Sequence, residues 1–125
     1  VEIARNDFLP TVNADPDQLK EVFVNLVINA CEAMDKGGAI RIEELVSTGP
    51  SGNREAVIRV CDNGPGIPAS LREKVFDPFF TTKEEGTGLG MSIAKRILSE
   101  HHGWIDIAAT EGGGATVIVT LPVKE

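Results

Sequence analysis

The chain is short of cysteine, of long hydrophobic runs and of basic residues, and each shortage excludes a class of protein. Its two cysteines, Cys31 and Cys61, lack the spacing of metal ligands, so we interpret them as small buried side chains in a reducing compartment. No apolar stretch approaches the roughly 20 residues that cross a bilayer, and no signal-peptide pattern is present. We therefore expect that this segment does not insert directly into a membrane and that it is cytoplasmic. The cytoplasmic part of a membrane-bound parent protein would also meet this expectation.

The acidic balance of the chain argues against nucleic acid as its main partner. The 125 residues carry 19 acidic and 12 basic side chains, a formal net charge of −7, whereas duplex binding needs a basic face. An acidic protein can still bind a phosphate-rich molecule when a metal ion and backbone amides supply local positive charge. The length suits one domain with its own core. Because the first residue is Val1 rather than methionine, we expect a piece of a longer protein.

Hydrophobic periodicity predicts two long helices. The first begins at Asp15–Pro16, where an aspartate can cap the helix and a proline fits its first position. Apolar residues recur in it at steps of three and four and form one buried stripe. It runs to about Met34, before Gly37–Gly38. The second long helix is predicted over residues 91–102, with Gly103 as its stop.

Short runs of β-branched and other apolar residues predict strands around these helices. The predicted strands cover residues 1–3, 11–13, 39–43, 56–61, 104–107 and 116–120, a hairpin turn covers residues 47–53, and a short helix covers residues 71–75. The long segment 77–90 is typical of a functional loop. Helices and hairpin strands in this order favour an α+β fold, a two-layer sandwich with helices on one face of a mixed sheet.

One face of the first helix carries an unusual polar stripe. Its members follow one another at steps of four, three and four residues, which places them on one side of the helix. They are Asn25, Asn29, Glu32 and Lys36. Asparagine is a middling helix former, so two of them one turn apart indicate a function. An asparagine carbonyl can complete a magnesium shell beside phosphates and waters; the alternative is an ordinary solvated face.

A second polar segment, Asp62–Ile67 (DNGPGI), follows a predicted strand. Gly64 and Gly66 allow backbone conformations and a close ligand approach that a Cβ atom would block. Asp62 is an acceptor-only carboxylate, which suits the amino group of adenine, whereas the carbonyl of guanine would face it with a second acceptor. The segment therefore predicts a contact that recognises adenine, with an ordinary aspartate-rich turn as the alternative.

A third segment, Gly86–Gly90 (GTGLG), precedes the second long helix. Its amides and the helix N-terminus can bind phosphates. A dinucleotide-binding loop would follow a strand, and a P-loop would end in lysine and serine or threonine, so neither motif fits. Lys83, just before the loop, is the candidate side chain for the terminal phosphate, with a solvated lysine as the alternative. Glycines here are also typical of a lid that opens and closes.

The remaining notable side chains have ordinary structural explanations. Phe76, Phe79 and Phe80 lie at the start of the long segment that would form the lid, and we expect them to anchor it to the core. His101 and His102 end a helix, where a cation suits the helix dipole. We do not expect either histidine to accept a phosphoryl group.

Together these segments resemble the motifs of the catalytic and ATP-binding domain of bacterial sensor histidine kinases, in the gyrase, chaperone, histidine kinase and mismatch-repair ATPase superfamily. The resemblance covers residues 1–122. The matching segments are Asn25–Ala30 for the N box, Asp62–Ile67 for the first glycine box, Phe76–Lys83 for the F box, Gly86–Met91 for the second glycine box, and His102–Gly103 with Gly112–Thr116 for the closing strands.

This resemblance implies a Bergerat fold, in which three helices cover a mixed sheet of about five strands and ATP lies under a lid between the short and the second long helix. It implies that Asn29 ligates magnesium, that Asn25 assists near the phosphates and that Asp62 recognises adenine. Thr116 would support the base end through its hydroxyl or a water. The expected nucleotide-binding residues are Asn25, Asn29, Glu32, Ala33, Asp62, Gly64, Gly66, Ile67, Thr82, Lys83, Gly86, Thr87, Gly88, Leu89, Gly90, Met91 and Thr116, with Asn25 and Lys83 as catalytic residues.

The resemblance also implies a protein-histidine kinase that transfers the γ-phosphate of ATP to a histidine for two-component signalling. Hydrolases of the superfamily carry a glutamate where Asn25 stands, so its absence favours transfer over hydrolysis. The implied partners are the protein's own dimerisation and phosphoacceptor helical domain, which we expect to lie outside the single domain of residues 1–125, and, indirectly, a response regulator. Two alternatives are a serine kinase of the anti-sigma-factor type on the same fold and a non-catalytic nucleotide-sensing or docking module.

Overall fold

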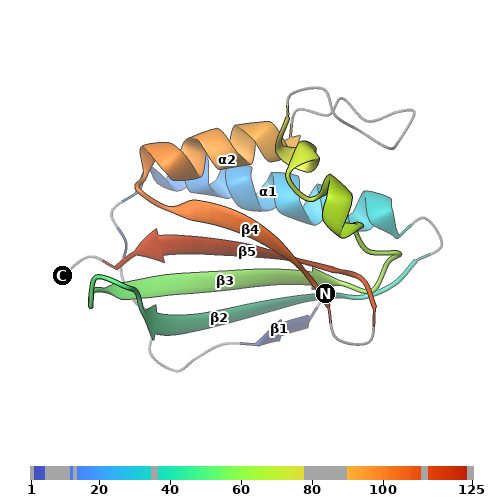
Figure 1. Ribbon diagram of the computed structural model, residues 1–125, viewed down its shortest axis with the longest axis horizontal. Helices are drawn as coiled ribbons and strands as arrows, with labels where there is room; N and C mark the ends of the chain where they lie inside the picture. Colours follow the sequence, from blue (N-terminus) through green and yellow to red (C-terminus); the bar gives the residue numbers. More distant parts are fainter. Residues whose placement is uncertain are drawn as a thin grey trace.

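The residues that the structure describes include five strands, which form one mixed sheet in the order β1-β2-β3-β5-β4 (Figure 1). The computed structural model describes residues 2–4, 12, 14–34, 37–77, 90–110 and 113–123. The strands are β1 (Glu2–Ala4), β2 (Ile40–Thr48), β3 (Arg54–Asp62), β4 (Trp104–Ala109) and β5 (Ala115–Pro122). β1 runs parallel to β2, and the other neighbours are antiparallel. The predicted mixed sheet of about five strands is confirmed.

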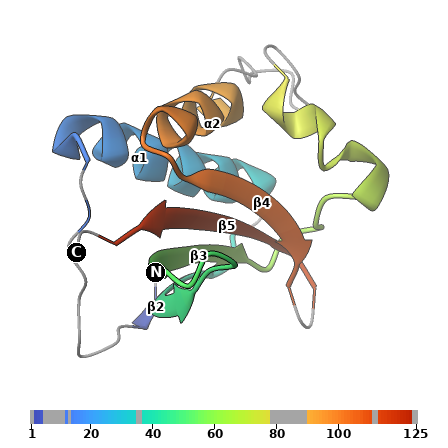
Figure 2. The same ribbon diagram turned by 60° about the vertical axis from the view of Figure 1, so that its left-hand side comes forward.

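Two α-helices lie side by side on one face of this sheet (Figures 1 and 2). They are α1 (Pro16–Ala33) and α2 (Gly90–Glu100). α1 begins where the sequence predicts, because the side-chain oxygen of Asp15 accepts a hydrogen bond from the backbone N–H of Asp17 at 2.9 Å. The two-layer α+β sandwich is therefore confirmed.

The hydrophobic core lies between the helices and the sheet. Alternate residues of β3 and β5 point at the apolar stripes of α1 and α2, and their large side chains are excluded from solvent. The largest fully buried side chains are Leu26, Ile97, Leu98, Val22, Val60 and Val119. Every layer of the sandwich contributes to this set, so the core holds α1, α2 and the two central strands in one relative position.

The structure corrects several predicted boundaries. β2 and β3 are longer than predicted, because their ladder continues without a break from the Ile40–Asp62 pair to the Thr48–Arg54 pair. The short helix predicted over residues 71–75 is instead two single-turn 3₁₀ helices, η1 (Ala69–Leu71) and η2 (Lys74–Phe76). The predicted lid, residues 77–90, lies almost entirely outside the described residues.

The stop of α2 differs from the expected one. His102, rather than Gly103, takes the left-handed conformation, with φ of 62°. Its N–H donates to the Ser99 carbonyl at 3.1 Å, and the Gly103 N–H donates to the Leu98 carbonyl at 2.8 Å, which is the Schellman arrangement. Gly103 is needed for space instead, since a methyl group there would collide with the carbonyl oxygen of Thr120 on β5.

The cysteine prediction is wrong for one residue. Cys31 is exposed on α1, and Cys61 on β3 is half-buried. Cys31 stands outside the buried stripe of Val22, Leu26 and Ala30 and therefore points away from the core. Within the described part of the chain, no helix combines the length and apolar character that crossing a membrane requires.

Candidate nucleotide-binding site

The polar stripe of α1 forms one side of the candidate site. Asn25 is half-buried, whereas Asn29 and Glu32 are exposed. Asn25 lies against the start of α2, because a methyl group at Gly90 would stand 3.6 Å from the Asn25 Cβ and Cγ atoms. The structure thus brings the first polar segment next to the end of the third one. Lys36 lies outside the described residues.

Asp62 is a buried carboxylate at the end of β3. Only 7% of its surface is exposed, and its Oδ1 accepts two backbone hydrogen bonds, from the Gly64 N–H at 3.0 Å and from the Ala115 N–H at 3.2 Å. Hydrogen bonds to a charged acceptor are stronger than neutral ones and hold the carboxylate in one orientation. Both bonds use the same oxygen, so the second carboxylate oxygen has acceptor capacity for a ligand.

The glycines around Asp62 let three segments approach closely. A methyl group at Gly64 would stand 3.0 Å from the carbonyl oxygen of Ala33, at the end of α1. Gly66 has φ of 80°, a conformation that favours glycine, and a methyl group there would lie 3.2 Å from the Gly114 carbonyl oxygen. Gly114 has φ of 98°, and a methyl group there would collide with the backbone oxygen of Asp62. The turn after β3 is therefore packed between α1 and the start of β5.

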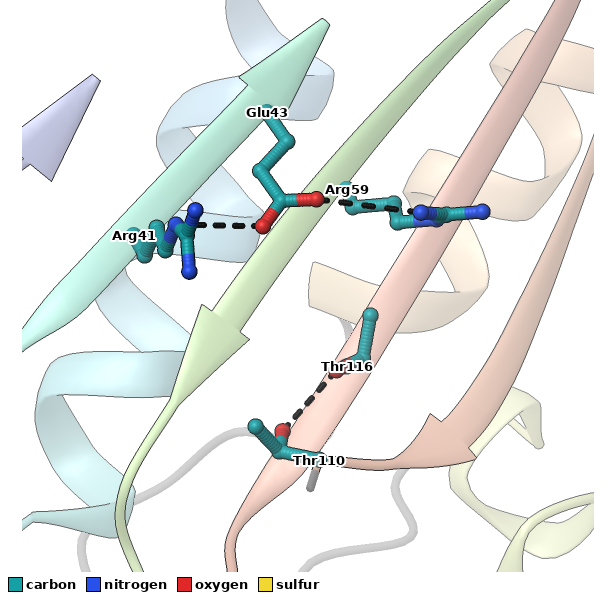
Figure 3. Close-up of polar contacts among 5 residues, drawn as sticks. All are labelled: Arg41, Glu43, Arg59, Thr110 and Thr116. Atoms are coloured by element: carbon teal, nitrogen blue, oxygen red, sulfur yellow. Dashed lines mark hydrogen bonds and ion pairs between the residues drawn. The ribbon is translucent and has the colours of Figure 1, made fainter. Parts of the chain in front are cut away.

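Thr116 does not reach the base end of this site. Residues that pair directly across β3 and β5 share a face, and Thr116 pairs with Cys61, one position away from Asp62. Its hydroxyl contacts the Thr110 hydroxyl at 2.9 Å on the face of the sheet opposite the helices, where Glu43 also bridges two arginines (Figure 3). Ala115 stands on the Asp62 side in its place, so the structure does not support the expected role of the Thr116 hydroxyl.

Two other predicted residues have roles that the sequence did not suggest. Met91 is 5% exposed and belongs to the hydrophobic core, so its side chain is not available to a ligand. Ile67 is half-buried, and its carbonyl oxygen accepts a hydrogen bond from the Arg72 Nε at 3.3 Å. This bond ties the glycine-containing turn to η1.

Phe76 is the part of the predicted lid anchor that the structure describes. Its half-buried ring packs against the core, and the Lys95 Nζ of α2 lies 5.2 Å from the ring centroid, within the range of a cation–π contact. The packing of Phe76 against the core is confirmed, whereas the lid that it was expected to anchor lies outside the described residues. The other predicted residues of this region lie outside the described residues: Phe79, Phe80, Thr82, Lys83, Gly86, Thr87, Gly88 and Leu89.

The sequence prediction missed one residue of the Asp62 environment. Ala115 contributes through its backbone N–H, and no side-chain chemistry marks such a donor. The alternation of apolar residues along 115–121 was the available signal, because it places Ala115, Val117 and Val119 on one face and Thr116 on the other.

The fold and this clustering define a nucleotide-binding α+β domain, and comparison with known proteins gives its family. Residues 14–125 match the family described as "Histidine kinase-, DNA gyrase B-, and HSP90-like ATPase". The chain belongs to this family. Since the family is one of ATPases, ATP is the nucleotide that the site is expected to take.

The relatives of this chain include histidine kinases. It is 44% identical over 116 residues to the signal transduction histidine-protein kinase AtoS of Escherichia coli, and the match covers 93% of this chain and 18% of AtoS. It is 44% identical over 113 residues to sporulation kinase C of Bacillus subtilis, covering 90% of this chain and 25% of that kinase. The chain therefore spans only about a fifth to a quarter of the length of these relatives.

Solved structures confirm the Bergerat-type architecture. The catalytic domain of the histidine kinase ThkA has a TM-score of 0.80 and 39% sequence identity, and the match covers 96% of this chain and 76% of that one. ThkA in complex with its response regulator TrrA matches 98% of this chain and 33% of the ThkA chain, with a TM-score of 0.78 and 35% identity. The fold that the sequence motifs implied is thus the fold observed.

Proposed function

We propose that this chain is the ATP-binding catalytic domain of a sensor histidine kinase that transfers the γ-phosphate of ATP to a histidine on a separate helical domain. The observation that carries the proposal is the orientation of Asp62. Its carboxylate is buried and fixed by two backbone donors, while the asparagine stripe of α1 lies on the neighbouring element. One end of the site then recognises a base and the other carries polar groups for metal and phosphates.

The base end suits adenine. The second oxygen of Asp62 accepts a hydrogen bond from the amino group of adenine, whereas guanine presents a carbonyl there and leaves two acceptors facing each other. Leaving buried polar groups unpaired in this way is what rejects the wrong base. Asp62 is therefore the residue that selects the nucleotide.

The metal end suits magnesium. Mg²⁺ prefers oxygen ligands and keeps several waters, so it needs only one or two protein ligands in addition to the phosphates. Asn29 is exposed on α1, one turn from Asn25, and its side-chain carbonyl is a ligand of the required kind. When bound, the ion neutralises charge on the β- and γ-phosphates. We assign Asn29 as its protein ligand and Asn25 as a residue that positions the phosphates.

The chain's own residues act in the transfer by binding and orientation. Asp62 holds the base, and the stripe of α1 holds the triphosphate at a defined distance from it. The acceptor imidazole nitrogen forms a bond to the γ-phosphorus while the bond between that phosphorus and the β–γ bridging oxygen breaks, and ADP leaves with that oxygen. Asn25 cannot act as a general base for water, so the arrangement favours transfer to the histidine over hydrolysis.

The phosphoacceptor domain and the response regulator are the proposed partners, at a cytoplasmic location. On α1, Val24 and Ile28 are 46% and 49% exposed, directly beside the asparagine stripe. Large apolar side chains exposed next to a binding site are typical of an interface. A helical domain that covers them would bring its histidine to the phosphate end of the nucleotide. The solved structures that resemble this chain include ThkA in complex with the response regulator TrrA, which supports a regulator as the next acceptor.

Calorimetry of magnesium–ADP binding tests the proposal. We expect binding by the unmodified chain and a loss of roughly tenfold or more in affinity for Asn29→Ala, because a ligand to a charged centre contributes about 1.5–3 kcal/mol. Asn53→Ala is the matched control, since Asn53 is an exposed asparagine in the β2–β3 turn at the other end of the strands. An unmodified chain that produces no binding heat, or an Asn29→Ala variant with unchanged affinity, would contradict the proposed function.

A further inference from the structure

Asn63 connects two parts of the site that are distant in sequence. Its Oδ1 accepts a hydrogen bond from the backbone N–H of Ala39 at 3.0 Å, across a separation of 24 residues. Ala39 lies in the connection between α1 and β2, whereas Asn63 follows Asp62 at the end of β3. The side chain of Asn63 therefore joins the turn that carries the adenine contact to the segment that follows the asparagine-bearing helix.

The packing around this bond shows that the two segments touch. At Gly38 a methyl group would collide with the Asn63 Oδ1 and stand 2.5 Å from the Met34 Sδ. At Gly64 a methyl group would lie 3.0 Å from the Ala33 carbonyl oxygen and 3.3 Å from the Met34 Cγ. Neither glycine has a positive φ, so the neighbouring atoms and not the backbone conformation restrict a side chain at these two positions. At Gly64 the nearest of these atoms belongs to the backbone of Ala33, so the end of α1 and the turn after β3 are in close contact.

We infer that Asn63 is a positioning residue that sets the distance between the adenine-recognising end and the phosphate end of the site. The inference rests on the proposed function, because it concerns the same nucleotide. Asp62 is adjacent to Asn63, and Asn29 lies on α1 one turn before Ala33, which contacts the turn. A nucleotide that bridges both ends needs them at one separation. Without the hydrogen bond from Ala39 to Asn63, the turn after β3 samples other separations from α1. Apparent affinity falls with the fraction of molecules in the competent arrangement.

This role predicts different effects on two ligands. Magnesium–ADP touches both ends of the site, whereas adenosine touches only the base end. Asn63→Ala removes one hydrogen bond and is expected to weaken magnesium–ADP binding roughly threefold to tenfold. Its effect on adenosine is expected to be smaller. Asn63→Asp keeps an acceptor oxygen for the Ala39 N–H and is expected to bind magnesium–ADP within about threefold of the unmodified chain, at a salt concentration that screens the added charge.

The experiment measures both affinities for four proteins. Magnesium–ADP is titrated by calorimetry and adenosine by competition with a fluorescent adenine nucleotide, using the unmodified chain, Asn63→Ala, Asn63→Asp and the control Asn53→Ala. A selective loss of magnesium–ADP affinity in Asn63→Ala, with recovery in Asn63→Asp, supports the inference. Unchanged affinity, an equal loss for both ligands as unfolding would give, or no recovery with aspartate overturns it. If the unmodified chain binds and Asn29→Ala does not, while Asn63→Ala binds normally, this inference fails and the proposed function stands.

Discussion

At the scale of single residues, Asp62 owes its orientation to the backbone of two separate segments. Gly64 comes two residues later in the same turn, and Ala115 comes from the start of β5. Both donors bind the same oxygen, so the geometry leaves the other one for the ligand. In the proposed role of Asp62, a carboxylate prepared in this way would discriminate between bases without moving, because its hydrogen-bond direction is already set.

This arrangement predicts the effect of Asp62→Asn. The amide can keep its oxygen toward the Gly64 and Ala115 donors, which places an NH₂ group where the second carboxylate oxygen was. We expect the preference for ADP over GDP to fall by roughly tenfold or more, since a donor suits the guanine carbonyl and opposes the adenine amino group. Calorimetric titration with both magnesium-bound diphosphates measures the preference. Asp106→Asn on β4 is the control, and an unaltered preference in Asp62→Asn would refute the assignment.

Thr116 shows that a shift of one position along a strand moves a side chain to the opposite face of the sheet. The family resemblance implied that its hydroxyl supports the base end, but neighbouring residues of a strand point to opposite faces. The pairing of Thr116 with Cys61 puts it on the side of Thr110, away from Asp62. Ala115 donates to Asp62 through its backbone N–H, and a backbone donor cannot be recognised from the residue type.

At the scale of elements, His101 joins the two helices. Its Nδ1 donates to the Ile97 carbonyl at 2.7 Å, and its Nε2 accepts from the Asp15 N–H at 3.1 Å. The two bonds define the tautomer, with the proton on Nδ1. The sequence suggested a cation interacting with the helix dipole at this position, whereas the structure uses a neutral ring that links the end of α2 to the cap of α1.

This link predicts a loss of stability in His101→Leu. The substitution leaves the Asp15 N–H without its acceptor and is expected to lower the free energy of unfolding by about 1 kcal/mol, a drop of a few degrees in Tm. His101→Gln, whose side-chain oxygen can accept near the Nε2 position, is expected to recover part of the loss. Thermal unfolding measures both, with His102→Asn as a control that keeps a residue type tolerant of positive φ. Equal stability of the leucine and glutamine variants would argue against the hydrogen bond.

At the scale of the whole molecule, the sandwich exposes the phosphate end of the site beside an apolar surface. Val24 and Ile28 occupy the α1 face next to the asparagine stripe and point away from the core. The relatives are several times longer than this chain, which leaves room in them for a helical phosphoacceptor domain. Under the proposed function, nucleotide binding and docking of that domain would depend on neighbouring but different side chains of one helix.

This separation predicts that Ile28→Glu uncouples binding from transfer. A charge in the proposed apolar interface costs desolvation energy, so we expect phosphorylation of an added histidine-bearing helical domain to fall at least about tenfold while magnesium–ADP affinity is unchanged. Labelled ATP measures the transfer, and Glu21→Gln on the same helix is the control. The chain without that domain is expected to acquire no label, because the acceptor histidine lies elsewhere. Label on the isolated chain, or full transfer by Ile28→Glu, would contradict this view.

Local sequence signals were enough to predict the class of fold and most of the polar segments of the site. Helix caps, apolar periodicity and glycine-rich turns are local signals, so α1, its asparagine stripe and the Asp62 turn were predictable from residues close together in the chain. Only the tertiary structure decided which segments meet: Ala115 with Asp62, Ala39 with Asn63, and Asp15 with His101. These bonds join distant residues through backbone groups and strand register, which are set by packing of the whole core and not by any one segment.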